Sequence, residues 1–373
     1  MQPEPPPALD ELAALAAHRA TPSVTLQLAT SPLAVDIYPT RIEFRNLAAE
    51  VERQLDVHDT PSPVRKRMAA ALAALNDDEE FWRSQDEGLV VLADDEQLRA
   101  FRLHETVTNS VAVGDRFDVG ALLRDATAPD RAFLLELTEG TVRLLALTRD
   151  RPPIEEPIAV PDDVRLELTY ADNTGDADKE RAGGAVGQNP ERRRYSSIIQ
   201  DVVLTRIGPR AWPLVLAASI ELEPAYREIN RYPLLVQESL GINPSYQEPG
   251  DLADRAWKII DAARSAELAG WRELFGTRHA HGLAVSGLQE VATAATAAAV
   301  EELIFDVDAV VPGSIDEFGV LHAGDFATPP VYNVVDEIVA RVLSTDGRVR
   351  SVHADELVDE SPVAAMLRFP VST

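Results

Sequence analysis

Clustered arginines are the most distinctive chemical feature of this sequence. Residues 179–210 hold seven basic and three acidic residues, a net charge of +4, in a chain whose net charge is −27. Such a cluster can neutralise the phosphates of a nucleic acid, and glycines nearby let a backbone approach another polymer closely. An ordinary flexible loop whose arginines pair with acidic neighbours would have the same composition, so both interpretations stay open. The basic residues are Lys179, Arg181, Arg192, Arg193, Arg194, Arg206 and Arg210.

Motifs of the common catalytic chemistries are absent. The phosphate-binding patterns G-x-G-x-x-G and G-x-x-x-x-G-K-[ST] do not occur, nor do the G-x-S-x-G elbow and the H-E-x-x-H zinc motif. With no cysteine in the chain, disulfides, thiolate metal sites and cysteine nucleophiles are excluded. His279 and His281 are two residues apart but fall in a predicted loop, 277–282. The acidic runs 77–80 and 94–96 are typical of solvated turns. We predict no metal site and no cofactor.

The overall charge restricts the partners. A chain with 62 acidic and 35 basic residues repels nucleic acid and anionic membranes on average, so RNA binding needs a local basic patch. Apolar stretches stay well below the ~18 residues that span a bilayer. The first residues lack the pattern of a secretory signal. We expect a cytoplasmic protein without membrane or DNA partners, although protein partners remain open.

The elements that position the basic segment belong to a multi-domain α/β chain. Apolar spacing predicts an N-terminal α/β domain over residues 1–112, a middle domain over 113–247 and a C-terminal α/β domain over 248–373. The elements expected in the first domain are a short helix within 8–19, helices at 41–55 and 62–75, and strands at 24–29, 88–92 and 98–103.

The middle and C-terminal domains also alternate strands and helices. Between the strand predicted at 164–170 and the helix at 192–207 lies an aperiodic stretch, 171–190, too long for an ordinary connection and therefore either functional or disordered. The other elements expected in the middle domain are helices at 118–126 and 222–229 and strands at 131–138, 141–148 and 213–219. Those expected in the C-terminal domain are helices at 251–269, 283–301 and 331–343 and strands at 302–307, 348–353 and 363–369.

The order of these segments resembles the archaeo-eukaryotic peptide-chain release factors and Pelota. The likeness covers about residues 22–370 and rests on several short motifs. The motif 228–233, Glu-Ile-Asn-Arg-Tyr-Pro, and Phe81-Trp82 with Gly88 look most like the bacterial branch of the family. The remaining motifs lie at 88–91, 113–117, 121–123, 213–217 and 361–369.

The resemblance implies an RNase H-like middle domain and a C-terminal domain like the kink-turn-binding ribosomal proteins. In the family, a Gly-Gly-Gln loop enters the peptidyl-transferase centre, where its Gln helps water attack the peptidyl-tRNA ester. The corresponding loop here includes Gly183, Gly184, Gly187 and Gln188. Either Gly187-Gln188 is the remnant of the motif, or Ala185-Val186-Gly187 interrupts the tripeptide. The contiguous motif is lost, and residues 22–112 show no counterpart of the codon-reading motifs.

Three functions follow as hypotheses. The first is a ribosome-associated translation factor acting in rescue, hibernation or stress, with its basic loop 171–194 toward rRNA in the A site. The second is a peptidyl-tRNA ester hydrolase in which Gln188 orients water, and the third is an acidic protein-interaction module that no longer binds ribosomes. The RNA-binding residues expected under the first are Lys179, Arg181, Gly183, Gly184, Gly187, Arg192, Arg193 and Arg194.

Overall fold

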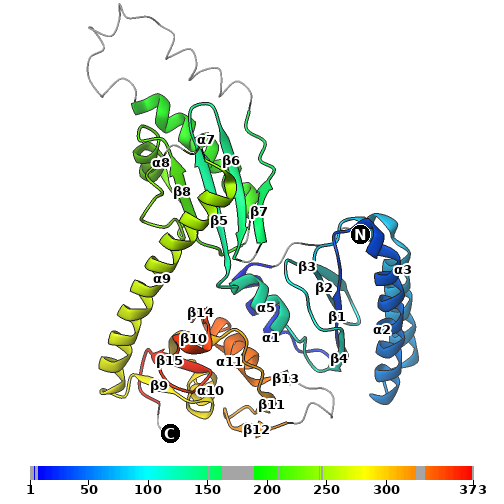
Figure 1. The fold of residues 1–373 in the computed structure, drawn as a ribbon. Helices are drawn as coiled ribbons and strands as arrows, with labels where there is room; N and C mark the ends of the chain where they lie inside the picture. The colour runs from blue at the N-terminus through cyan, green and yellow to red at the C-terminus, as the bar shows by residue number, and fades with distance from the viewer. Residues whose placement is uncertain are drawn as a thin grey trace, which may run out of the picture. The chain divides into compact units, whose positions relative to one another are not determined.

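The computed structural model describes residues 4, 7–149, 151–161, 189–208, 210–242, 244, 247–324 and 332–371 (Figure 1). The described chain divides into two compact units. Unit 1 combines residues 1–128 with 271–373, and unit 2 is residues 129–270. Both are mixed α/β structures containing β-sheets, which confirms the predicted fold class. The finer division into three domains stays a prediction.

Unit 1 contains an antiparallel sheet in the order β3-β2-β1-β4. Alternate residues of β1 face opposite sides, and Val24, Leu26 and Leu28 pack against α2 and α3 in one core. Trp82 of α4 closes that core and donates its indole N–H to the carbonyl of Leu75, at 3.1 Å. The elements are β1 (Ser23–Ala29), β2 (Gly88–Ala93), β3 (Leu98–Leu103), β4 (Ser110–Gly114), η1 (Ala34–Asp36), α2 (Ile37–Val57), α3 (Ser62–Asp77) and α4 (Glu79–Arg83).

The other face of this sheet shares a core with the C-terminal part of unit 1. Val90 and Phe101 belong to the same cluster of buried side chains as Leu122 of α5 and Ile338 of α11. Because this cluster is continuous, the N-terminal and C-terminal sheets belong to one compact unit. The elements are α1 (Leu9–Ala17), α5 (Gly120–Thr127), α10 (Leu288–Thr296), α11 (Val334–Leu343), η3 (Ala354–Glu356), β9 (Ala284–Ser286), β10 (Val300–Asp306), β14 (Arg348–Val352) and β15 (Val363–Leu367).

The C-terminal sheet has the order β14-β10-β15-β9, in which β10 and β14 are parallel. A small sheet, β12-β11-β13, consists of β11 (Pro312–Ile315), β12 (Leu321–Ala323) and β13 (Tyr332–Asn333). The prediction of a single helix at 283–301 is wrong. Gly287 and Ala298 take positive φ values, 98° and 55°, which end a regular helix, so β9, α10 and β10 share this stretch.

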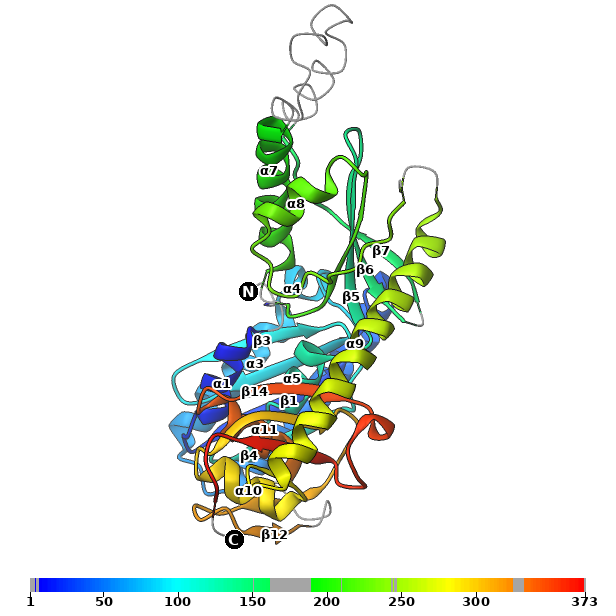
Figure 2. The same cartoon turned by 90° about the vertical axis from the view of Figure 1, so that its left-hand side faces the viewer.

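Unit 2 is a sheet in the order β7-β6-β5-β8 with helices on both faces. Figure 2 shows α7 and α8 on one side and α9 on the other. The strand pair β5 and β8 is parallel, and the chain between them includes α7. The elements are β5 (Arg131–Leu137), β6 (Val142–Thr148), β7 (Arg151–Glu156), α7 (Asn189–Ile207), β8 (Leu214–Ala218), α8 (Glu223–Ile229) and α9 (Pro249–His279), which continues into unit 1.

Candidate nucleic-acid interface

The arginine triad, Arg192–Arg194, lies in the first turns of α7. The triad directly precedes Tyr195, which with Ile199 and Val203 packs into the core of unit 2. The Tyr195 hydroxyl donates a hydrogen bond to the carbonyl oxygen of Thr138 at 2.9 Å, which fixes this end of the helix against the sheet. Arg193 and Arg194 are exposed and Arg192 is half-buried. The fold therefore presents guanidinium groups at the end of a firmly seated helix.

The triad is not there to stabilise the helix. A helix carries a partial positive charge at its N-terminus, so cations in the first turn reduce helix stability. Of the first-turn residues in α7 only Glu191 is acidic. Three adjacent arginines at this end therefore gain no stabilisation from the helix dipole.

An acidic partner already contacts one member of the triad. Arg193 donates from Nε to Oε2 of Glu228 at 2.5 Å, and both side chains are 46% exposed. Exposed ion pairs of this kind contribute about 0–1 kcal/mol, because water and salt screen them. A phosphate could therefore displace Glu228 at little cost.

The motif 228–233 holds α7 in place. Asn230 accepts a hydrogen bond from the Gln200 side-chain amide at 2.9 Å, and Arg231 forms an ion pair with Asp201. The Tyr232 hydroxyl donates to the carbonyl oxygen of Trp212 at 2.6 Å, and burial raises the pKa of this phenol. Residues of the motif 228–233, which resembles the bacterial branch of the family, therefore connect α7 to the sheet and to α8.

Two other arginines of the basic segment have structural partners. Arg206 and Arg210 both form ion pairs with Glu156 of β7, Arg210 at 2.9 Å. The Arg210 guanidinium also lies 4.8 Å from the ring centre of Phe133. For these two residues, pairing with acidic neighbours is the interpretation that the structure supports. The remaining expected residues, Lys179, Arg181, Gly183, Gly184, Gly187 and Gln188, lie outside the described residues, as do the predicted strand 164–170 and most of the loop.

Both histidines of the pair contact backbone carbonyls. His279 lies in the last turn of α9, not in the expected loop, and its Nδ1 is 3.0 Å from the carbonyl oxygen of Ala284. The Nδ1 atom of His281 is 2.8 Å from the carbonyl oxygen of Thr277. Within the described part of the chain, no three His, Asp or Glu side chains are grouped to hold a metal ion.

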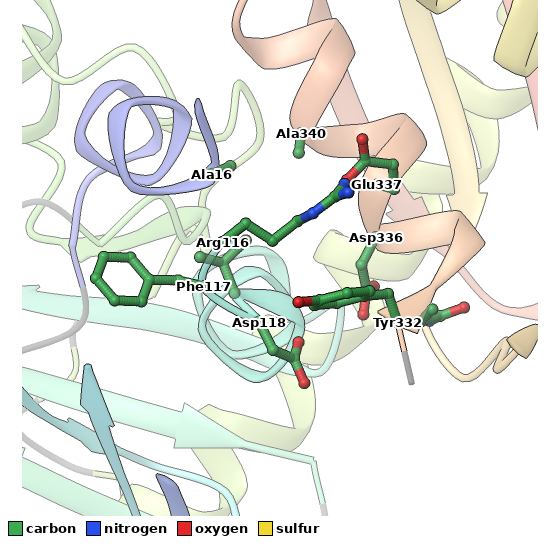
Figure 3. A pocket seen from close by; sticks show the side chains of 10 residues that line it. Ala16, Arg116, Phe117, Asp118, Tyr332, Asp336, Glu337 and Ala340 are labelled. Carbon is green, nitrogen blue, oxygen red and sulfur yellow. The ribbon is translucent and has the colours of Figure 1, made fainter. Parts of the chain in front are cut away.

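A second charged cluster lies in unit 1, between α5 and α11 (Figure 3). Arg116 donates to Glu337 at 2.9 Å, and its guanidinium lies 4.9 Å from the ring centre of Tyr332. Asp336 pairs with Arg124 at 3.1 Å. The cavity beside these groups measures only about 20 Å³, room for one water molecule. Sequence reasoning missed this cluster because its members are more than 200 residues apart, and we assign it a structural role.

Gly120 permits the closest approach in this cluster. A Cβ atom at this position would lie 1.9 Å from Oδ2 of Asp336, so only glycine leaves room for the carboxylate. Burial raises the pKa of Asp336 to about 6, and the neighbouring Asp118 adds to the rise, while Arg124 opposes it. The raised pKa means that the folded state binds this proton more tightly than the unfolded state does.

The titration of Asp336 predicts a measurable pH effect on stability. Because the pKa of Asp336 is near 6 in the folded state, against an ordinary value of 3.8, its ionisation lowers the free energy of unfolding at pH 7. The protein regains this free energy as the pH falls through about 6 and the carboxyl group is protonated. Between pH 7 and pH 5 the expected gain is about 1 kcal/mol. We expect urea denaturation to show this gain in the wild type relative to Asp336→Asn. Parallel pH profiles of the two proteins would contradict it.

One family model matches the unit that bears the arginine triad. Residues 129–266 match the model of bacterial archaeo-eukaryotic release factor family 11. The resemblance inferred from the sequence is confirmed. The matched region covers nearly all of unit 2, including α7 and the motif 228–233. The family match supports a translation-factor-like role.

Solved structures with similarity to the chain include translation factors. An archaeal translation termination factor, aRF1, is 14% identical with a TM-score of 0.25, covering 97% of this chain and 99% of that one. Yeast Dom34 (S. cerevisiae), a translation termination-like factor in RNA quality control, is 14% identical with a TM-score of 0.37, covering 76% and 74%. Archaeal Pelota in a ribosome-bound assembly has the same identity and TM-score, covering 76% and 78%. Similarity at this level assigns no activity to this chain. No curated protein matches it.

No helix in the described ranges is both long and apolar enough to cross a membrane.

Proposed function

We propose that this protein is a ribosome-associated translation factor, acting in rescue, hibernation or stress, that contacts rRNA in the A site through the loop 171–194 and the arginine triad. The observation that carries the proposal is the triad at the N-terminal end of α7, with Arg193 and Arg194 exposed, inside the region that matches the model of the release factor family. The helix end and the guanidinium groups both favour phosphate. The family match and the positive charge of this segment both favour binding to RNA, although the chain as a whole is acidic.

The proposal predicts sedimentation with ribosomes. Purified full-length protein should pellet with ribosomes at low salt and be released as salt rises, because phosphate contacts are screened and exchanged for counterions. A protein that stays in the supernatant at every salt concentration would favour the third hypothesis, an interaction module that has lost ribosome binding.

Hydrolysis of peptidyl-tRNA is not expected. In the family's loop two glycines directly precede the Gln, whereas here Val186 precedes Gly187-Gln188 and adds a stiff, branched side chain. Displacing a catalytic group by about 1 Å can cost on the order of 100-fold in rate. We expect no accelerated release of peptide from ribosomes in a single-turnover assay, and unchanged ribosome affinity for Gln188→Ala. Release activity that disappears in Gln188→Ala would establish the hydrolase instead.

A further inference from the structure

A cavity of about 560 Å³ lies in unit 1, at the C-terminal end of α9 (Figure 1). Its walls come from α9, from β9 and from the segment that follows η3. Pockets that hold small molecules have volumes of about 300–1,000 Å³. None of the lining residues belongs to the arginine triad or to the charged cluster of Figure 3. The cavity is therefore a separate site with room for a small ligand.

An aromatic stack builds the wall that α9 contributes. The ring centres of Trp271 and Phe275 are 5.2 Å apart, and those of Phe275 and His279 are 5.8 Å apart. Because these residues are spaced by four, they lie on one face of the helix. Trp271 and Phe275 are buried, whereas His279 is exposed. The buried rings therefore hold the His279 ring in position at the wall of the cavity.

The contact of His279 with the chain before β9 sets its tautomer. Its Nδ1 lies 3.0 Å from the carbonyl oxygen of Ala284, and a carbonyl oxygen only accepts hydrogen bonds. Nδ1 therefore carries the proton, and Nε2 of the neutral ring is left as an acceptor. An acceptor at this wall suits a ligand that brings N–H groups.

Hydrogen bonds hold the wall that follows η3. Arg272 of α9 donates to the carbonyl oxygen of Glu356 at 2.6 Å, which connects the helix to η3. The carboxylate of Asp359 accepts from the backbone N–H of Ser361 at 2.9 Å. Between these two bonds, residues 357–358 contribute apolar side chains to the lining. The cavity is preformed, which reduces the entropic cost of binding a ligand.

The lining contains charges of both signs that form no ion pair within the described part of the chain. Arg272, Asp355 and Asp359 are all exposed, and no carboxylate or guanidinium of the described residues pairs with them. In the same ranges no three His, Asp or Glu side chains are grouped closely enough to hold a metal ion. The lining therefore offers one cation and two anions, and an organic ligand with one anionic and two cationic groups would balance it.

We propose that this cavity binds a basic amino acid in its free form, arginine in particular. The ligand carboxylate pairs with Arg272, and the α-ammonium and guanidinium groups pair with Asp355 and Asp359. Charge-assisted hydrogen bonds of this kind are about twice as strong as neutral ones. The guanidinium has five N–H donors, so it can also donate to Nε2 of His279. The aliphatic stem packs on residues 357–358. Binding here requires neither the ribosome nor the triad.

Isothermal titration calorimetry of the full chain with L-arginine tests the proposal. Agmatine lacks the carboxylate of arginine, and L-norvaline lacks the guanidinium. We expect L-arginine to bind saturably with a dissociation constant below about 1 mM, and each analogue to bind at least about tenfold more weakly.

Variants of the lining separate the charges. Arg272→Gln should weaken L-arginine binding at least about tenfold and leave agmatine binding within about twofold, because agmatine has no carboxylate to pair with Arg272. Asp355→Asn should weaken the binding of both compounds. Glu317→Gln, which removes an exposed carboxylate of unit 1 outside the cavity, should change neither. Thermal midpoints of the three variants should equal that of the wild type.

Three outcomes would overturn the proposal. They are an L-arginine affinity weaker than about 1 mM, an affinity for agmatine or L-norvaline equal to that for L-arginine, and a loss of affinity in Arg272→Gln that is the same for L-arginine and agmatine. Because no ribosome is present in these titrations, their result is independent of whether the chain binds ribosomes.

Discussion

Phe133→Ala is expected to destabilise unit 2 by about 3–5 kcal/mol, because the ring is completely buried and a cavity would remain. Phe133 stacks on Trp212 with ring centres 4.9 Å apart and lies under the Arg210 guanidinium. The side chains that seat α7 belong to the same core. Urea denaturation should show the loss, and hydrogen exchange should show faster opening of α7 than in the wild type.

Ile154→Ala is the matched control on the same sheet. Ile154 lies on the edge strand β7 and is 64% exposed, so its truncation should change the free energy of unfolding by no more than about 0.5 kcal/mol. Equal denaturation midpoints for Phe133→Ala and Ile154→Ala would mean that the core beneath the arginine triad is wrongly assigned.

Neutralising the triad, with Arg192, Arg193 and Arg194 all changed to Gln, is expected to weaken ribosome binding roughly 100-fold at 0.1 M salt. Removing three phosphate contacts should also reduce the slope of log affinity against log salt by about 2–3. Glu228→Gln should act in the opposite direction, because it frees Arg193 from its acidic partner. Binding is measured by sedimentation of labelled protein with purified ribosomes across a salt series.

A matched triple variant controls for the change in net charge. Arg53, Arg67 and Arg83 of unit 1 are 56–69% exposed, and each forms an ion pair with a carboxylate. Changing these three to Gln alters the net charge equally but should leave affinity and salt slope within about twofold of the wild type. Equal losses in the two triple variants would show that overall charge, not the triad, governs binding.

Most elements of unit 2 could be predicted, because the central residues of its buried strands form continuous apolar runs. The strands expected at 131–138 and 213–219 appear as Arg131–Leu137 and Leu214–Ala218. Strand β7 was missed because Pro152-Pro153 argues against a strand, although prolines are tolerated on an edge strand. Hydrophobic periodicity finds strands with several buried side chains and misses β7, in which only Glu156 is buried.

The candidate site was only partly accessible to sequence reasoning. The triad is visible as a run of arginines, and its position before a buried Tyr195 follows from helical spacing. The pairing of Arg206 and Arg210 with Glu156 could not be foreseen, because it joins residues about 50 apart that meet only once the sheet has formed. The net charge of residues 179–210 therefore overestimates how many of its arginines are available to bind a partner.

Directed hydroxyl-radical cleavage tests the central claim most directly. Since the chain has no cysteine, Glu191→Cys gives a single attachment point for Fe(II)-EDTA beside the intact triad, and Glu52→Cys on α2 serves as a control. Both positions are exposed. With iron at position 191 of ribosome-bound protein, the account predicts cleavage of rRNA around the A site that iron at position 52 does not produce. Absence of rRNA cleavage from position 191, or the same pattern from both positions, would contradict it.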